Sequence, residues 1–483
     1  MQLSSLQDHD GGCTMTLSTG AWAAQQWAQV ELGDRRLTRR AVEIGTLMAA
    51  HAEASLPEQM GSPSVLKAAY WLLNHPGVSL AALTAPHRQQ TLQAASTEKV
   101  VLLVEDTTEL DFTAHASKTG RGPIGDGRGR GLLLHSTLAI VPSHRTLLGL
   151  AHAQVVLRQP KAERPKKWVR TPEGRVWEVS AARVGSPPAG VCWVHVSDSG
   201  SDIFEYMAVC RQQQKHFLIR AFRNRRLVWP DASAEATEPT AQAVLDYVAH
   251  LEPQPGSEYT VLLPAEGQQS ARQAHLALQW AAITLVPPVQ APAEIQAHGP
   301  LKVWLVRAWE PDPPPGVEAV EWVLLSSLPV ETLADAQTRV AWYTCRWFCE
   351  DFHQCLKTGC RIEQRQLDDG ADIQRLLGFA LPIAVRLLQL RQTVRQAPQV
   401  PALTVVEPLL VQVLARRQGL DWQTLTAEQF WLQVARLGGH QGRRRDGPPG
   451  WRTVWRGWRY LSDLADGARL VAVPDTNMQE TYG

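Results

Sequence analysis

The sequence predicts a mixed α/β protein in which helical segments flank a central region rich in strands. From Ala21 to about Ser96, apolar residues recur at three- and four-residue spacing, as on helices with one buried face. Between residue 97 and about residue 327, short apolar and β-branched runs separated by turn residues replace that pattern. The helical spacing then returns and continues toward the end of the chain. We find no internal repeat.

The whole-chain numbers limit the possible partners and compartments. The 483 residues include 48 Lys and Arg against 47 Asp and Glu, so a polyanion would have to be met by local basic patches. The N-terminus has no apolar signal-peptide core, and no uninterrupted apolar run approaches the roughly 18 residues of a membrane span. We therefore expect a cytoplasmic protein. Seven cysteines without a repeating spacing argue against a disulfide framework.

Composition divides the chain into three predicted domains. Residues 1–96 form a helical N-terminal domain. Residues 97–397 form the core, which contains a β-rich insertion at about 227–327 marked by the loops "PQPG" and "PDPPPG". Residues 398–483 form a helical C-terminal domain. Within the first domain, four cations fall in pairs one helical turn apart and predict a basic helix edge: Arg35, Arg36, Arg39 and Arg40.

Two carboxylates are predicted to follow buried strands. The run "KVVLLVED" ends at Asp106 and "VCWVHVSD" ends at Asp198. An acid at a strand end is ordinarily a turn or helix cap, and we prefer that interpretation for Asp202, which precedes "IFEYMAVCRQ". Together with Glu350 on a helix, however, Asp106 and Asp198 make an oxygen-ligand set suited to Mg²⁺. Two such ions about 3.5–4 Å apart can promote an in-line phosphoryl displacement.

The stretch "WYTCRWFCEDFHQCLKTG", residues 342–359, predicts a helix with two distinct faces. At 100° per residue, four polar side chains share one narrow stripe: Tyr343, Arg346, Glu350 and Lys357. Three apolar side chains fall on the opposite side: Phe348, Phe352 and Leu356. Exposed ion pairs contribute only about 0–1 kcal/mol, so stability alone does not explain a carboxylate flanked by two cations and a phenol.

A zinc site is the alternative interpretation of the same stretch. Cys345, Cys349 and His353 recur every four residues on one helix face. This face lies beside the apolar stripe, and the sequence offers no fourth ligand at zinc-site spacing. We therefore interpret the cysteines as buried thiols.

The spacing Tyr343-x2-Arg346-x3-Glu350-x6-Lys357 resembles the Tyr-Arg-Glu-Lys signature of bacterial DDE transposases of the insertion-sequence-four family. The resemblance extends through "WAQVELGDRR", "VEDTTEL", "SDSGSDIFEY", "EWVLLSSLPVETLA" and "AVRLLQLRQ", and so covers most of the chain. It implies a ribonuclease-H-like catalytic core interrupted by a β-rich insertion, with helical N-terminal and C-terminal domains. The implied activity is cut-and-paste DNA transposition through a hairpin intermediate.

The resemblance also implies roles for individual residues. Asp106, Asp198 and Glu350 would be the catalytic triad and would bind two Mg²⁺ ions per active site, with Mn²⁺ able to substitute. The residues that would contact DNA phosphates are Tyr343, Arg346, Lys357 and Arg220. Trp322 would stack on a flipped base, although an aromatic side chain filling a strand core deserves nearly equal weight. Ser199 and Phe222 stand where the family pattern has cations, which weakens the expected grip on phosphates.

The implied partners are double-stranded DNA, both transposon ends and target, and a second copy of the chain in a synaptic complex. The N-terminal arginines would help read the DNA ends. Helices after about Pro398, including "WRTVWRGWRYL", would form the homodimer contact through uncovered indoles, or else pack within one subunit. We expect a bacterial cytoplasmic location, nucleoid-associated on DNA, and no membrane. Two alternatives stay open: a ribonuclease-H-like DNA nuclease without strand transfer, and a catalytically inactive transposon-derived DNA-binding protein.

Overall fold

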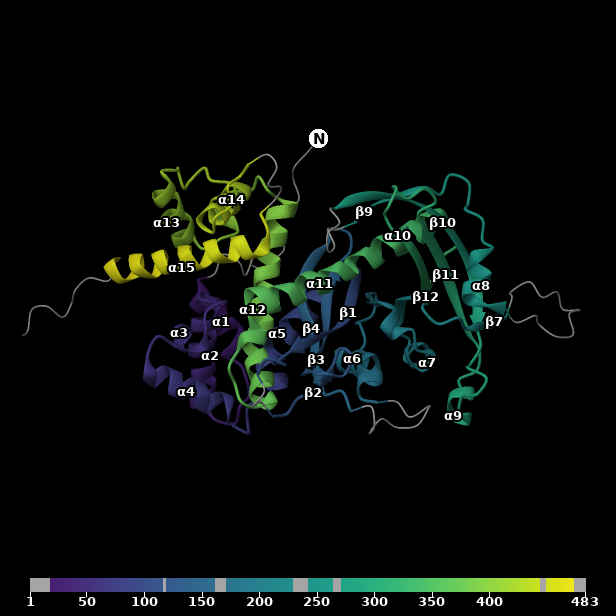
Figure 1. Ribbon diagram of the computed structural model, residues 1–483, viewed down its shortest axis with the longest axis horizontal. Helices are drawn as coiled ribbons and strands as arrows, with labels where there is room; N and C mark the ends of the chain where they lie inside the picture. The colour runs from purple at the N-terminus through teal and green to yellow at the C-terminus, as the bar shows by residue number, and fades with distance from the viewer. Residues whose placement is uncertain are drawn as a thin grey trace, which may run out of the picture.

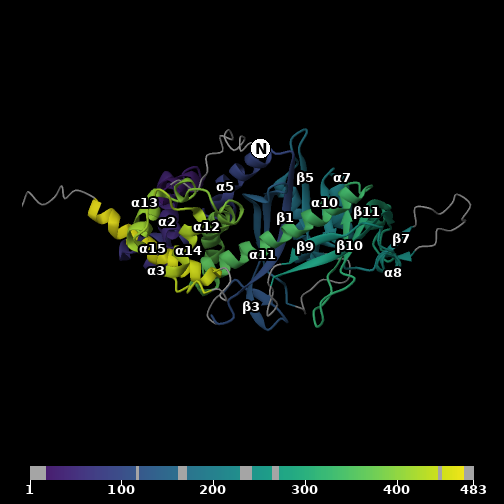
Figure 2. The ribbon, with the colours of Figure 1, turned by 90° about the horizontal axis from the view of Figure 1, so that it is seen from above.

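A twelve-stranded mixed sheet runs through the molecule, with the N-terminal and C-terminal helices gathered at one end of it (Figure 1). The computed structural model describes residues 18–115, 119–160, 171–228, 242–263, 271–443 and 449–472. The mixed α/β class predicted from the sequence is confirmed. From above, the later strands and helix α8 lie at the opposite end from α13 and α15 (Figure 2).

Five helices come first among the described residues, and each begins at a side-chain cap. They are α1 (Thr19–Trp27), α2 (Arg35–Ala50), α3 (Leu56–Met60), α4 (Pro63–Leu73) and α5 (Leu80–Ala95). A serine or aspartate side chain accepts a hydrogen bond from the first turn of every one. Trp27 is fully buried against Phe379 of a later helix, with ring centroids 5.3 Å apart. These helices therefore share a core with the rest of the chain.

The first half of the sheet combines antiparallel and parallel pairing. Its strands are β1 (Val100–Asp111), β2 (Gly122–Ile124), β3 (Gly129–Val141), β4 (Thr146–Val156), β5 (Cys192–Ser197) and β6 (His216–Arg220). β3 is antiparallel to both β1 and β4, whereas β5 is parallel to β1 and β6 is parallel to β5. Helices α6 (Val176–Val184) and α7 (Phe204–Gln212) flank β5 in the sequence.

The predicted β-rich insertion extends this sheet instead of forming a separate layer. Its strands are β7 (Arg226–Val228), β8 (Gln242–Ala243), β9 (Tyr259–Leu263), β10 (Arg272–Leu285), β11 (Leu301–Trp309) and β12 (Glu321–Ser326), with the short helices α8 (Val244–Ala249) and α9 (Ala293–Gln296). β12 lies antiparallel to β6, and β11, β10, β7 and β8 follow in that order. The return of the chain through β12 therefore sets the next helices beside the first half of the sheet.

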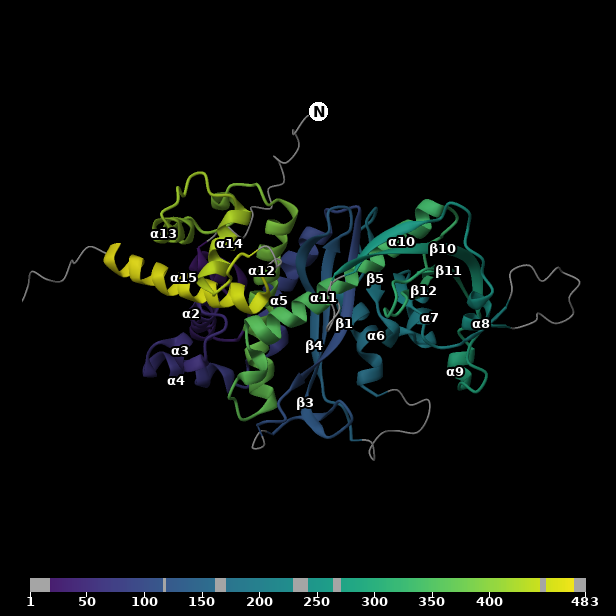
Figure 3. The ribbon, with the colours of Figure 1, turned by 45° about the horizontal axis from the view of Figure 1, so that its top comes forward.

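The stretch predicted as one regular helix is interrupted twice. Helix α10 (Leu333–Tyr343) passes through a 3₁₀ turn, Thr344–Arg346, into α11 (Trp347–Gln354), which ends in a π turn, Cys355–Gly359. Helix α12 (Gly370–Gln396) then runs through the centre of the molecule, and α13 (Pro408–Gln418), α14 (Ala427–Leu437) and α15 (Trp451–Ala472) complete the chain. In Figure 3, α11 leads from α10 toward α12 and α15.

Helix α12 is the core helix of the structure. Within the described ranges it is the one helix long and apolar enough to cross a membrane, over Gly370–Val394. Yet 78% of its most apolar stretch is buried by the chain itself. Contacts with α2, α4, α5, α14 and β4 cover it.

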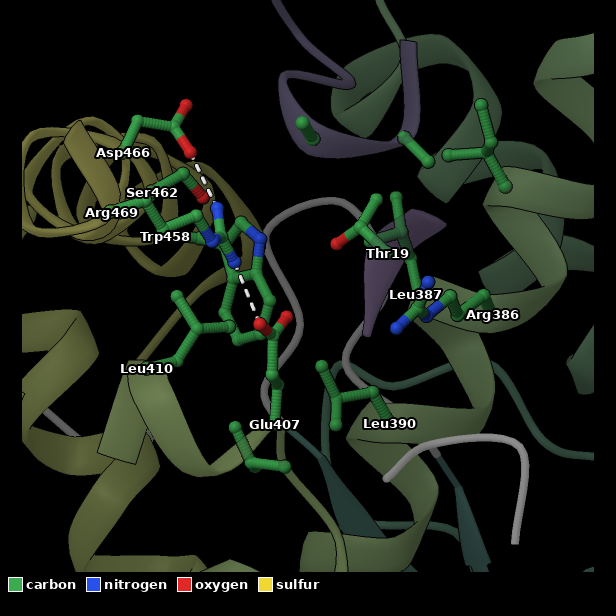
Figure 4. A pocket seen from close by; sticks show the side chains of 14 residues that line it. Thr19, Arg386, Leu387, Leu390, Glu407, Leu410, Trp458, Ser462, Asp466 and Arg469 are labelled. Carbon is green, nitrogen blue, oxygen red and sulfur yellow. Dashed lines mark hydrogen bonds and ion pairs between the residues drawn. The ribbon is translucent and has the colours of Figure 1, made fainter. Parts of the chain in front are cut away.

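Side chains from the N-terminal and C-terminal helices meet at a polar junction (Figure 4). A cavity of about 40 Å³ lies there. Beside it, the Arg469 guanidinium of α15 forms ion pairs with Glu407 at 2.7 Å and with Asp466 at 2.5 Å. His51, just after α2, lies 3.1 Å from the same Asp466 carboxylate. On the far wall, Arg386 of α12 stacks 4.7 Å above the ring of Trp22.

Trp455 and Trp458 of α15 pack within the chain, so of the two predicted arrangements, uncovered indoles at a dimer contact or packing within one subunit, the second holds for these two residues. Trp455 is 3% exposed and lies against Gly359, where an added Cβ would come 3.1 Å from the indole. Trp458 packs on Trp431 and Phe430, with ring centroids 5.4 and 6.3 Å away. The side chain of Trp451 lies outside the described residues. Helix amphipathicity indicated a buried apolar face, but could not show whether this chain or a partner covers it.

Candidate active site

Parallel pairing of β1 and β5 brings Asp106 and Asp198 to neighbouring positions. Glu105 lies opposite Ser197, and each aspartate is the next residue along the chain. Asp198 follows the end of β5, as predicted, but Asp106 does not end its strand. β1 continues to Asp111 because it stays paired with β3, where Asp106 lies opposite Ser136. The predicted strand-end position of Asp106 is therefore wrong, although its neighbour is the expected one.

The alternation of side chains along β1 decides which face each acid occupies. Leu102 and Val104 belong to the core that contains α11 and α12, whereas Val101 and Leu103 pack with the α6 residue Val184 on the other side. By this two-residue period, Asp106 shares the α11 face and Glu105 the opposite one. The backbone carbonyl of Val104 accepts a hydrogen bond from the Cys349 thiol of α11 at 3.3 Å, which fixes that helix beside β1.

Glu350 projects from α11 and is held by Arg346. The guanidinium lies 2.8 Å from the Glu350 carboxylate, and the side chains are 17% and 49% exposed respectively. Burial acts to lower the pKa of Arg346, but Tyr343 and the carboxylates of Glu350, Asp106 and Asp198 raise it overall. One cation therefore interacts with all three predicted catalytic acids.

The crowding of these acids is strongest at Asp106. Burial, then the nearby Asp198 and, more weakly, Glu350 raise the pKa of Asp106 to about 7. A hydrogen bond of 2.8 Å from the Thr107 amide and the charge of Arg346 oppose that rise. His353 Nδ1 lies 3.9 Å from Asp106, but burial lowers the pKa of His353 to about 3, so its ring is neutral at pH 7. Asp106 thus lies among like charges, which the charge of Arg346 offsets only in part.

The donor set suits a hard cation, but its members are not gathered into a ligand shell. Throughout the described ranges, no three His, Cys, Asp or Glu side chains lie close enough to hold a metal ion. Glu350 is bonded to Arg346, and Asp198 Oδ1 accepts a 2.9 Å hydrogen bond from the Gly200 amide. Three carboxylates that share one electrostatic field are nevertheless the oxygen ligands that Mg²⁺ prefers. In donor chemistry these residues fit magnesium, and Glu350 would have to exchange its partner.

Asp202 has a structural role, but not the predicted one. Its side chain is buried and forms an ion pair with Arg225. It also accepts hydrogen bonds from the amides of Phe222 and Arg223, at 2.8 and 2.6 Å. Helix α7 begins after Ile203 and has no side-chain cap. Asp202 therefore anchors the loop after β6 instead of capping α7.

An aromatic and cationic cluster lies beside the acids. Trp322 of β12 is 8% exposed and meets Tyr343 edge to face, with ring centroids 5.3 Å apart. The Arg346 guanidinium lies 5.8 Å from the Tyr343 ring. Arg220, at the exposed end of β6, donates to the Glu321 carbonyl at 3.1 Å. The structure thus brings Trp322, Tyr343 and Arg346 together as predicted, while the burial of Trp322 also suits an aromatic side chain that fills the sheet.

Lys357 is separated from this cluster. The π turn displaces it from the stripe predicted for a regular helix, and its ammonium donates to the Glu109 carbonyl of β1 at 2.6 Å. It also lies 3.5 Å from the Glu363 carboxylate. The two positions where the sequence lacks an expected cation differ in setting, since Phe222 is 72% exposed and Ser199 is half-buried.

Sequence reasoning missed a buried polar group directly beneath the acids. Glu105 is fully buried and interacts with His195 Nδ1 at 3.0 Å and the Ser180 hydroxyl at 2.9 Å. Burial acts to raise the pKa of Glu105, but His195 and its other partners lower it overall. The period of two in "VED" could have placed this acid on the opposite face from Asp106.

The predicted buried thiols are confirmed. Cys345 and Cys349 are 1% and 0% exposed, and burial raises the pKa of both thiols. His353 is 6% exposed. All six cysteines among the described residues are free.

The predicted basic edge lies on the first turns of α2. Arg35, Arg36 and Arg39 are exposed. Arg36 pairs with the helix-capping Asp34 at 2.8 Å, and Arg40 pairs with Glu43 at 2.8 Å. Three of the four arginines thus offer guanidinium groups to solvent.

A comparison with protein families identifies these helices. Residues 19–78 match the family described as transposase DNA-binding. The match runs from the start of α1 past the end of α4 and includes the basic edge of α2. It supports a transposase that binds DNA.

Proposed function

We propose that this chain is a cut-and-paste DNA transposase of the insertion-sequence-four family, within which it is most similar to the transposase of transposon Tn-five. One observation carries the proposal: Asp106, Asp198, Glu350 and Arg346 share one electrostatic field in a chain whose N-terminal helices match a transposase DNA-binding family. Carboxylates crowded in this way are more typical of a functional site than of a structural one.

The strand arrangement supports a ribonuclease-H-like core. Strands β4, β3, β1, β5 and β6 lie side by side, the first three antiparallel and the last two parallel to β1. This order suits that core, and the strands from β7 to β12 would be its β-rich insertion.

Each site residue then has a role in holding DNA or metal. Asp106, Asp198 and Glu350 would hold two Mg²⁺ ions, or Mn²⁺, which when bound stabilise the attacking and leaving oxygens of phosphoryl transfer. Arg346, Tyr343 and the more distant Lys357 and Arg220 would hold the DNA backbone. Trp322 would leave its ring contact with Tyr343 to stack on a flipped base, an interaction of roughly 1–3 kcal/mol.

The proposal includes a homodimer on paired transposon ends, at work in the bacterial cytoplasm and bound to the nucleoid. Since Trp455 and Trp458 pack within the chain, a dimer contact on the C-terminal domain would use other exposed apolar side chains. Tyr460 and Val471 of α15 are 43% and 87% exposed.

Product mapping separates this function from its alternatives. The test is to incubate the protein with Mg²⁺ and candidate inverted-repeat DNA taken from the sequences flanking its own gene, with Glu350→Ala as the control. Hairpin ends and strand-transfer products from wild type alone would support transposition. Linear cleavage products alone would favour a nuclease, and binding without cleavage would favour an inactive DNA-binding protein.

A further inference from the structure

A second basic site lies outside the carboxylate cluster, in a groove of about 560 Å³ that we call the α15 groove. It lies where the first half of α15 meets the π turn after α11. In Figure 3 the start of α15 lies next to the end of α11. Four cations line it: Lys357, Arg361, Arg456 and Arg459. Two acids, Glu53 and Glu363, oppose them.

Three of the cations lie near the carboxylate of Glu53. Burial raises the pKa of Glu53, and the charges of Arg459, Arg361 and Arg456 only partly offset that rise. In the described part of the chain, none of the three forms an ion pair with Glu53 within 4 Å. Asp463 also acts on Glu53, in the same direction as burial. The lining itself has four cations and two acids, so the groove is basic.

The present partners of these guanidinium groups leave donors to spare. Arg459 lies 3.7 Å from Glu58, a loose ion pair. Arg456 is exposed and donates to the Gly438 carbonyl at 3.4 Å. Arg361 donates to Gln364 at 2.6 Å. A guanidinium has five N–H donors and can donate two of them to the oxygens of one phosphate. Each of the three arginines can therefore bind a phosphate while it keeps its present partner.

The groove is also held in shape. Arg361 has a φ of 49°, a left-handed conformation that is uncommon for residues other than glycine. Such outliers gather at functional sites. The buried Trp455 fixes α15 against Gly359 of the π turn, so the two walls cannot easily separate. On the helix, Arg456 and Arg459 are three residues apart and share a face.

The position of the groove identifies its ligand. Glu53 follows α2 inside the segment that matches a transposase DNA-binding family, while Lys357 lies at the end of the α11 stretch that carries Arg346 and Glu350. A surface that joins those two regions would lie along a DNA duplex bound by both. We propose that the α15 groove binds the phosphodiester backbone of double-stranded DNA between the N-terminal helices and the active site, an inference that rests on the proposed function.

The test compares the salt dependence of DNA binding in paired variants of the full chain. The probe is a fluorescein-labelled 40-bp duplex, with anisotropy measured between 50 and 200 mM KCl without divalent metal. Arg456→Gln/Arg459→Gln should lower the slope of log K against log [KCl] by about 1.8, because each lost phosphate contact contributes about 0.9. Between 50 and 200 mM KCl, the loss of affinity should therefore be about twelvefold smaller in this variant than in wild type. Arg416→Gln/Arg417→Gln, two exposed cations in the last turn of α13, should keep the wild-type slope.

A second variant tests the groove without removing a cation. Glu53→Gln takes away a like charge beside the phosphate, so it should bind the same duplex about threefold more tightly. Unchanged or weaker binding by Glu53→Gln, or equal slopes in the two arginine pairs, would overturn the assignment.

Failure of the groove is distinguishable from failure of the proposed function. A wild-type protein that forms hairpins and strand-transfer products, together with groove variants that keep the full salt slope, would reject the groove alone. If wild type cleaves no DNA but the groove variants have a lower salt slope than wild type, the result would support a DNA-binding groove and reject the transposase activity.

Discussion

Asp106 offers the most direct test that the acids share one site, because their crowding has a cost in stability. The pKa of Asp106 rises from an ordinary 3.8 to about 7 on folding. The folded chain thus retains a proton that the unfolded chain has lost between these two values. The free energy of unfolding must therefore fall as the pH rises through this window, by about 4 kcal/mol at most.

Asp106→Asn removes the charge with little change in shape. The amide oxygen can still accept the 2.8 Å hydrogen bond from Thr107. In EDTA at pH 8 the variant should therefore be more stable than wild type, by up to about 4 kcal/mol. At pH 5 the gain should shrink to about 1–2 kcal/mol, because folded wild-type Asp106 is then largely protonated. Urea unfolding followed by tryptophan fluorescence at both pH values measures the difference.

Asp202→Asn is the matched control, because it also neutralises a buried aspartate. That residue is ion-paired with Arg225, so its loss should destabilise the protein by about 3–5 kcal/mol. Added Mg²⁺ should stabilise wild type but not Asp106→Asn, since binding to the folded state alone raises its stability. If Asp106→Asn is less stable than wild type at pH 8, or its effect does not change with pH, the acids do not repel one another and the shared site is wrong.

Three further outcomes follow from the proposed roles. Asp198→Ala and Glu350→Ala should each abolish strand cleavage with Mg²⁺ while leaving DNA affinity within about twofold, as gel assays of nicking and binding would show; retained nicking removes that residue from the triad. Trp322→Ala should leave first-strand nicking near normal and stall before the hairpin, whereas normal hairpin formation returns the residue to a role in the sheet. Arg36→Gln/Arg39→Gln should lower the salt slope of binding by about 1.8 in anisotropy titrations, and an unchanged slope would move DNA contact away from α2.

The acids could be chosen from the sequence because strand patterns are local. Short apolar, β-branched runs located β1 and β5, and the acid that follows each run marked Asp106 and Asp198. The sequence could not show that β1 continues to Asp111, since that extension depends on pairing with β3 along its length. It also could not show that β12 joins β6, because strand order is a tertiary property.

Helical periodicity was reliable only while the helix was regular. It placed Arg346 and Glu350 on one face, where they form an ion pair. It failed at Lys357, because the π turn after Gln354 changes the angular spacing. A regular helical wheel also cannot predict the 3₁₀ turn at Thr344–Arg346. At this turn Tyr343 and Cys345 pack into the core.

The charges around Asp106 connect stability with the proposed chemistry. Three acids interact with one guanidinium, and Asp106 keeps a pKa near 7 despite that cation. An apolar residue at that position would fold with less cost, so the arrangement is not explained by stability. The remaining repulsion would be relieved by a divalent cation, while an Arg346 released from Glu350 would be free to pair with a phosphate. Metal binding to Glu350 would release Arg346 for a DNA phosphate, and phosphate binding to Arg346 would release Glu350 for the metal. DNA and metal would therefore each favour the binding of the other.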